Sequence, residues 1–126
     1  MKVREILHGE PPTAAPDESA SSAWERMHEE RVNHLVVLKA GRVVGLVSKD
    51  DLSGPAGGSH RRMGRRVADL MRREVPTVSP ETDLRRAVTR MRRSAVVCLP
   101  VVDRGRLVGA VTVSDLLTLL ERQLEA

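Results

Sequence analysis

Residues 34–52 read HLVVLKAGRVVGLVSKDDL, and residues 98–116 read CLPVVDRGRLVGAVTVSDL. In each stretch an apolar run is followed by a short turn that contains glycine and then by a second apolar run. Gly41 and Gly105 stand in these turns, where glycine adopts a positive φ without steric cost. Each stretch is therefore predicted to form a β-hairpin, with strands over 32–38 and 42–47 in the first and over 96–102 and 106–111 in the second.

The two stretches belong to an internal repeat. At an offset of 64 residues, positions 3–52 align with positions 67–116 without a gap, and 18 of the 50 pairs are identical. Such a repeat indicates one small unit that occurs twice and cannot bury its apolar face alone. The chain is therefore predicted to contain a first motif over 1–60 and a second over 61–126. The segment 53–66, SGPAGGSHRRMGRR, is predicted to be a flexible, basic linker that begins within the first range.

Helices are predicted on both sides of each hairpin. Before the hairpins, proline, acidic and hydroxyl residues typical of a helix start precede apolar residues at i, i+3, i+4 and i+7. These apolar residues are Ala20, Ala23, Trp24 and Met27 in the first copy, and Leu84, Ala87, Val88 and Met91 in the second. After the hairpins, a second helix is predicted to begin at Lys49 in the first copy and to run from about Val113 to Leu124 in the other.

The composition restricts the classes of function. The chain has 126 residues with 21 Lys+Arg and 17 Asp+Glu, and residues 61–126 hold 14 of the basic residues. Trp24 is the only aromatic residue, which argues against binding of single strands by base stacking. Cys98 is the only cysteine, so an intramolecular disulfide and a four-thiolate zinc site are excluded. Since no apolar run approaches the roughly 18 residues of a spanning helix, we expect a cytoplasmic protein without a membrane span.

The pattern G-x-V-[S/T]-x-x-D ends the second strand of both hairpins. It places Ser48 three residues before Asp51, and Thr112 three residues before Asp115. One interpretation is a capping box in which hydroxyl and carboxylate satisfy the helix N-terminus. The other is a nucleotide site, in which the hydroxyl and helix N-terminus meet a phosphate and the carboxylate accepts both hydroxyls of a ribose. The glycine of the pattern would then let a ligand approach the backbone closely.

With these residues, the chain resembles a pair of cystathionine-β-synthase-type (CBS) motifs, together a Bateman module, over residues 3–120. The most specific segments are VADLM at 67–71, VPTVSPETDL at 75–84 and VVCLPVVDRGRLVGAVTVSDL at 96–116; the first copy departs at Val36 and Lys39, where the second has Pro100 and Asp103. The resemblance implies an α/β fold of two tandem β-α-β-β-α motifs packed around a pseudo-two-fold axis. It also implies a regulatory module that is not an enzyme and requires no cofactor. The expected ligands are AMP, ADP, ATP, S-adenosylmethionine or an NAD-type nucleotide.

The resemblance further implies two ligand clefts between the motifs. One would combine Ala110, Thr112 and Asp115 with Pro11, Pro12, Val32 and Asn33. The other would combine Leu46, Ser48, Lys49 and Asp51 with Val75, Pro76, Val96 and Val97. The aspartates would accept the ribose hydroxyls, and Asn33, which can hydrogen-bond adenine, favours the first cleft.

The expected partners are a small adenosyl ligand, a second copy of the chain and an unidentified effector protein. The homodimer is predicted to form through helices that begin near Ser19, Thr82 and Ser114. Two alternatives remain: a ligand-free structural homodimer, and a nucleic-acid-associated protein that uses the basic half. No metal site is predicted. Arg61, Arg62, Arg65 and Arg66 are interpreted as a solvated loop, Trp24 as a core or dimer contact, and Cys98 as a buried apolar residue.

Overall fold

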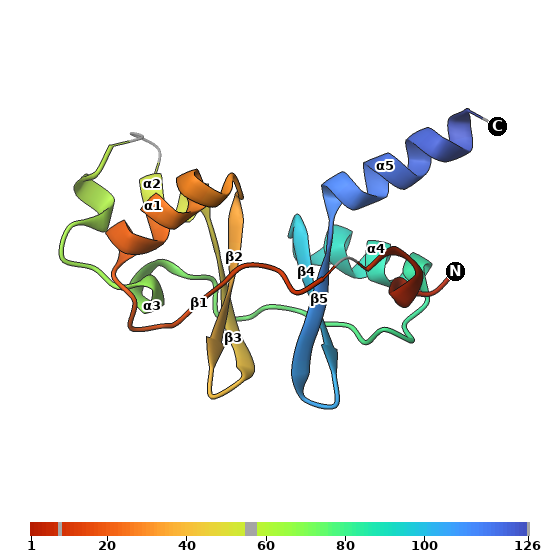
Figure 1. Cartoon of the computed structure of the whole chain (residues 1–126), viewed down its shortest axis with the longest axis horizontal. Helices are drawn as coiled ribbons and strands as arrows, with labels where there is room; N and C mark the ends of the chain where they lie inside the picture. Colours follow the sequence, from red (N-terminus) through yellow and green to blue (C-terminus); the bar gives the residue numbers. More distant parts are fainter. Residues whose placement is uncertain (8, 55–57, 126) are drawn as a thin grey trace. The chain divides into compact units, whose positions relative to one another are not determined.

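The computed structural model describes residues 1–7, 9–54 and 58–125. The chain divides into two compact units (Figure 1). Pro11–Val75 is named here the central unit, and Met1–Glu10 together with Pro76–Ala126 the terminal unit. Both units contain helices and strands, which confirms the predicted α/β class. Within the described ranges, no helix is long and apolar enough to cross a membrane.

The central unit is built on a sheet with strand order β1-β2-β3, in which β1 is parallel and β3 antiparallel to β2. Its elements are β1 (Thr13–Ala14), α1 (Ala20–Glu30), β2 (His34–Lys39), β3 (Arg42–Ser48), α2 (Lys49–Ser53), η2 (His60–Arg62) and α3 (Val67–Leu70). Helix α1 begins after Ser19, whose side chain accepts a hydrogen bond from the backbone N–H of Ser22 at 3.1 Å. This cap satisfies a donor at the helix N-terminus and confirms the predicted helix start.

The terminal unit repeats this arrangement around the antiparallel pair β4-β5, with a single parallel bridge between Val78 and Val101 at the place equivalent to β1. Its elements are η1 (Val3–Ile6), α4 (Leu84–Ser94), β4 (Cys98–Asp103), β5 (Arg106–Thr112) and α5 (Val113–Leu124). Cys98 pairs with Thr112 as His34 pairs with Ser48 in the first copy, and both hairpins have a register shift after the fourth residue of their first strand. The two copies therefore share one hairpin geometry, as the repeat predicted.

Two consecutive residues with positive φ close each hairpin. They are Ala40 (51°) and Gly41 (78°) in the first, and Arg104 (51°) and Gly105 (78°) in the second. Two-residue turns of this kind match the right-handed twist of the flanking strands. The prediction for the glycines is confirmed, while Ala40 and Arg104 adopt a backbone conformation that is uncommon for residues with a Cβ.

Each unit has its own aliphatic core, in which one face of its first long helix packs on its hairpin. The core of the central unit consists of Ala14, Ala20, Ala23, Met27, Leu35, Val37, Val47, Leu52 and Val67. That of the terminal unit consists of Val3, Val78, Leu84, Ala87, Met91, Val96, Leu99, Val101 and Val111. Cys98 is also buried in the terminal unit, at 3% exposure, as predicted.

The first residues of each copy belong to the compact unit that contains the body of the other copy. Val3 of η1 is fully buried in the core of the terminal unit, and its N–H donates to the Thr82 carbonyl at 2.9 Å. The equivalent Val67 of α3 is fully buried in the central unit, and its N–H donates to the Glu18 carbonyl at 2.9 Å. The compact units thus differ from the sequence ranges 1–60 and 61–126, because the first residues of each copy pack with the body of the other.

Residues 55–57 of the predicted linker lie outside the described residues. Within the remainder, Arg62 is only 8% exposed, so its interpretation as a solvated loop residue is wrong. Its guanidinium carbon lies 4.1 Å from the centre of the Trp24 ring, and its Nη1 donates to the carbonyls of Leu52 at 3.2 Å and Gly58 at 3.3 Å. A desolvated cation over an indole face is stabilising. Trp24 itself is half-buried against the central core, which confirms the predicted core contact.

Candidate ligand-binding sites

The junction of β3 and α2 contains a reciprocal capping box. The Ser48 hydroxyl accepts a hydrogen bond from the Asp51 N–H at 3.0 Å, and the Asp51 carboxylate accepts one from the Ser48 N–H at 2.8 Å. Both side chains are half-buried. The local sequence produces this arrangement because residues Ncap and N3 of a helix lie within hydrogen-bond reach of each other.

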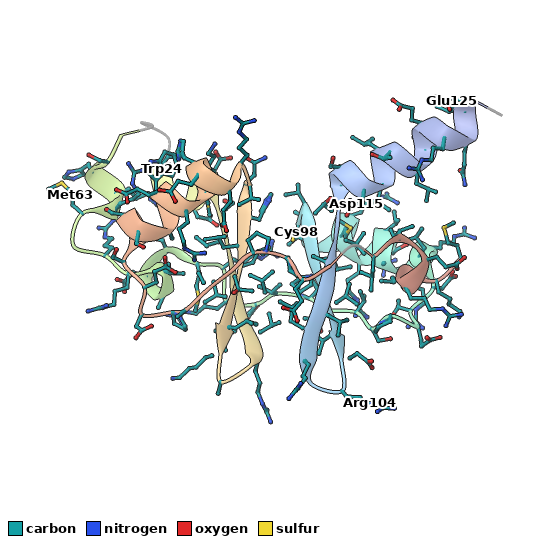
Figure 2. All side chains as sticks on the ribbon, viewed as in Figure 1. Trp24, Met63, Cys98, Arg104, Asp115 and Glu125 are labelled. Carbon is teal, nitrogen blue, oxygen red and sulfur yellow. The ribbon has the colours of Figure 1, made fainter. Side chains whose placement is uncertain are left out.

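The junction of β5 and α5 has the same geometry. The Thr112 hydroxyl accepts from the Asp115 N–H at 3.1 Å, and the Asp115 carboxylate accepts from the Thr112 N–H at 2.9 Å. Figure 2 shows Asp115 where β5 meets α5. The capping interpretation of both motifs is therefore confirmed. It does not exclude a ligand, because a carboxylate has two oxygens and about four acceptor positions.

A groove of about 160 Å³ lies beside Asp115 within the terminal unit. Its other lining residues were not among the predicted site residues: Glu5, Ile6, Leu7, Thr118, Leu119 and Arg122. Thr118, Leu119 and Arg122 follow Asp115 at i+3, i+4 and i+7, so helical spacing alone would have found them. Glu5, Ile6 and Leu7 are brought there by the exchange of the N-terminal segment, which no local pattern indicates.

The other predicted site residues fall in both units. Pro11, Pro12, Val32, Asn33, Leu46, Lys49 and Val75 lie in the central unit, and Pro76, Val96, Val97 and Ala110 in the terminal unit. In the central unit, the Asn33 carbonyl accepts a hydrogen bond from the Lys49 N–H at 2.9 Å, which places Asn33 beside the Ser48–Asp51 box. In the terminal unit, the Val97 carbonyl accepts from the Val113 N–H at 3.0 Å, beside the Thr112–Asp115 box. The grouping of the two sets into shared clefts stays a prediction.

Two of these residues have little surface to offer a ligand. Leu46 and Val96 are each 6% exposed. Leu46 also exchanges backbone hydrogen bonds with Arg72, at 3.0 and 2.8 Å. At the preceding Gly45, an added Cβ would meet the Met71 side chain and lie 3.0 Å from the Arg72 carbonyl oxygen. The segment of the chain at Met71 and Arg72 therefore makes the close approach that this glycine permits, in the place where the pattern predicted a ligand.

Two titratable groups near the boxes have shifted pKa values. Burial, with a smaller contribution from the Asp115 charge, raises the pKa of the Cys98 thiol to about 11, so it stays protonated and a poor nucleophile at neutral pH. Burial lowers the pKa of His34 below 6.5, against the opposing charges of Asp51 and Asp50. In the part of the chain that the structure describes, no three His, Cys, Asp or Glu side chains are grouped to hold a metal ion.

Comparison with known proteins identifies the family. The CBS domain family matches residues 3–54 and 67–122, and the chain belongs to it. Homoserine O-acetyltransferase of Methanocorpusculum labreanum is 30% identical over 122 residues, which are 96% of this chain and 24% of that protein. This chain thus spans about a quarter of the length of that relative.

Solved structures confirm the fold. The acetoin utilization protein AcuB from Vibrio cholerae has a TM-score of 0.82 at 27% identity, covering 99% of this chain and 93% of that chain. The CBS domain pair of protein MJ0100, solved in complex with 5′-methylthioadenosine and S-adenosyl-L-methionine, has a TM-score of 0.84 at 25% identity, covering 98% of each chain. The fold is that of a CBS domain pair.

Proposed function

We propose that this CBS pair is a non-catalytic regulatory module that binds an adenosyl compound. The observation that carries the proposal is the duplicated Ser/Thr–Asp box, with half-buried carboxylates at Asp51 and Asp115. A carboxylate held by its own helix N-terminus is fixed in place and charged, which suits it to accept the two adjacent hydroxyls of a ribose. The adenosyl ligands of the related MJ0100 pair support the same ligand class.

The groove beside Asp115 supports the terminal unit as the first place to look. Its lining combines apolar side chains, from Ile6 and Leu7, with the cation of Arg122. Binding sites of this kind use apolar walls and a few placed polar groups. The proposal includes the two clefts implied by the resemblance, a cytoplasmic location, a homodimer and an effector protein that reads the bound state.

The first experiment is a thermal-shift screen with AMP, ADP, ATP, S-adenosylmethionine, 5′-methylthioadenosine and NADH. A ligand that binds the folded chain raises its stability by RT ln(1 + [L]/Kd). The compound that shifts the melting temperature most is then titrated by calorimetry. A chain that none of these compounds stabilises at millimolar concentration would be the ligand-free structural alternative.

The carboxylate's role is tested with Asp115→Ala against a matched control. Asp69 makes only the carboxylate half of such a box at α3, where it accepts from the Arg66 N–H at 2.8 Å and the Arg66 side chain makes no cap hydrogen bond. Asp115→Ala and Asp69→Ala should each lose about 1 kcal/mol of stability as caps. Only Asp115→Ala, or Asp51→Ala for the other box, should weaken binding, by roughly 10- to 150-fold, as expected for loss of hydrogen bonds to a charged group. Unchanged affinity in both variants would refute the role of the boxes.

A further inference from the structure

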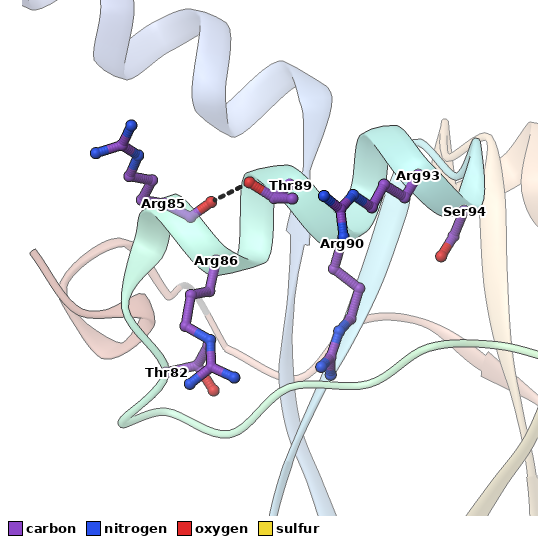
Figure 3. Close-up of a pocket in the computed structure, with 7 residues that line it drawn as sticks. All are labelled: Thr82, Arg85, Arg86, Thr89, Arg90, Arg93 and Ser94. Atoms are coloured by element: carbon purple, nitrogen blue, oxygen red, sulfur yellow. Dashed lines mark hydrogen bonds between the residues drawn. The ribbon is translucent and has the colours of Figure 1, made fainter.

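The exposed face of α4 is strongly basic. Leu84, Ala87 and Met91 point into the core, whereas five arginines and no acidic residue occupy the rest of the helix. A hollow of about 570 Å³ runs along this face, lined by Thr82, Arg85, Arg86, Thr89, Arg90, Arg93 and Ser94 (Figure 3). These positions follow helical spacing, so they form one continuous stripe, named here the arginine face.

One of these arginines has a structural role that both copies keep. Arg90 donates from Nη1 to the Thr77 carbonyl at 2.7 Å. The equivalent Arg26 donates from Nη2 to the Thr13 carbonyl, also at 2.7 Å. This pair of contacts ties each helix to the segment before it. This contact needs only the arginine that both copies share. The charged residues that differ between α1 and α4 are therefore not needed for it.

Apart from Arg26, the face of α1 that is equivalent to the arginine face of α4 carries negative charge. Glu25, Glu29 and Glu30 replace Thr89, Arg93 and Ser94, and serines replace Arg85 and Arg86. The three glutamates are exposed, and this stripe is named here the glutamate face. Among the described residues, the side chains of Arg85, Arg86 and Arg93 have no ion-pair partner within their unit, nor have those of Glu25 and Glu29.

We propose that these two faces meet between two copies of the chain, the glutamate face of one on the arginine face of the other. In a two-fold dimer this contact occurs twice, so both charged faces of both copies are neutralised together. The alternative, with like faces opposed, would bring arginine onto arginine and glutamate onto glutamate, which costs free energy. The proposal rests on the homodimer included in the proposed function and sets its orientation, and it does not depend on the adenosyl ligand.

Charge here selects the orientation more than it supplies affinity. An exposed ion pair changes an equilibrium constant by a factor of about two to five. Apolar area for affinity is available in the terminal unit, where Leu117 and Leu120 of α5 are 59% and 48% exposed. Because each substitution acts at both symmetric contacts, reversing two charges should raise the dimer dissociation constant by about 10-fold or more.

The test uses charge reversal on the full chain. Arg86→Glu with Arg93→Glu reverses the arginine face, and Glu25→Arg with Glu29→Arg reverses the glutamate face. Each pair alone should weaken the dimer in sedimentation equilibrium, and all four substitutions in one chain should restore it. The control is Arg42→Glu with Arg106→Glu, which makes the same change in net charge on the hairpins and should leave the dimer intact. Higher salt should weaken the parent dimer.

Three outcomes would overturn the proposal. The first is a four-substitution chain, folded by circular dichroism, that stays as weak as the two-substitution chains. The second is a parent dimer that tightens with salt, because that is the behaviour of opposed like charges. The third is a parent chain that stays monomeric and binds RNA or DNA through Arg86 and Arg93, which would assign the arginine face to phosphates. Calorimetry with AMP and with S-adenosylmethionine reports separately on the proposed function.

Discussion

Val3→Ala tests whether the N-terminal segment is part of the terminal unit. Val3 is fully buried there, next to Leu99 and Val111 in the same core. The substitution removes two methyl groups, which is about 1.6 kcal/mol of transfer free energy at about 0.8 kcal/mol each. A residual cavity of about 25 to 50 Å³ adds about 0.6 to 1.2 kcal/mol. The expected loss of unfolding free energy is therefore about 2 to 3 kcal/mol.

The assay is urea unfolding combined with hydrogen exchange read by mass spectrometry. Exchange should increase first in peptides from residues 84–111, since these share the core with Val3. The repeat offers a mirror experiment, because Val67→Ala should act in the same way on residues 20–53 of the central unit. Lys2→Ala, on the exposed neighbour of Val3, is the control. If Val3→Ala costs no more than Lys2→Ala, or loosens the central unit first, the exchange of segments is wrong.

Three further predictions concern the central unit. Arg62→Ala should lower the unfolding free energy, measured by urea titration, by about 2 kcal/mol, because it removes the cation–π contact and two charged hydrogen bonds. Arg61→Ala, at an exposed neighbour, should lower it by less than half as much. Gly45→Ala should destabilise because the new Cβ meets the Met71 side chain, and Gly45→Ala combined with Met71→Ala should recover part of the loss; strict additivity would contradict this. His34 has a pKa lowered below 6.5 by burial, so the unfolded chain binds its proton more readily and stability should fall as the pH drops below 6.5. His34→Gln should flatten that pH dependence, and an unchanged slope would show that His34 is not its source.

Much of the fold follows from short-range pattern. The hairpin turns at Gly41 and Gly105, the apolar face of α1 and the start of that helix at Ser19 all depend on residues within one or two turns of chain. The two capping boxes are predictable for the same reason, because their partners stand three residues apart. The repeat also predicted a feature that spans the whole chain, because two copies of one sequence unit are expected to adopt the same topology.

Contacts between segments that are distant in the sequence could not be predicted from short-range patterns. The sequence around Arg62 predicts an exposed basic loop, whereas in the structure Arg62 is buried and packs over Trp24. The sequence around Gly45 predicts space for a ligand, whereas in the structure the Met71 side chain lies there. In both cases the sequence indicates which contacts a residue could make. Which contact it does make depends on the distant segment of the chain that packs against it.

The sequence by itself determined the repeat, the order of the long helices and the hairpin strands, and the Ser/Thr–Asp boxes, because backbone geometry fixes what neighbours three or four residues apart can do. The tertiary structure alone decided that Val3 and Val67 are buried with the body of the other copy, and that the arginines of α4 and the glutamates of α1 lie on equivalent exposed faces. The physical reason is that many apolar segments of the chain can be buried, while the core has room for only some of them. A pattern of residues identifies the apolar segments, and only the packed structure shows which of them are in contact.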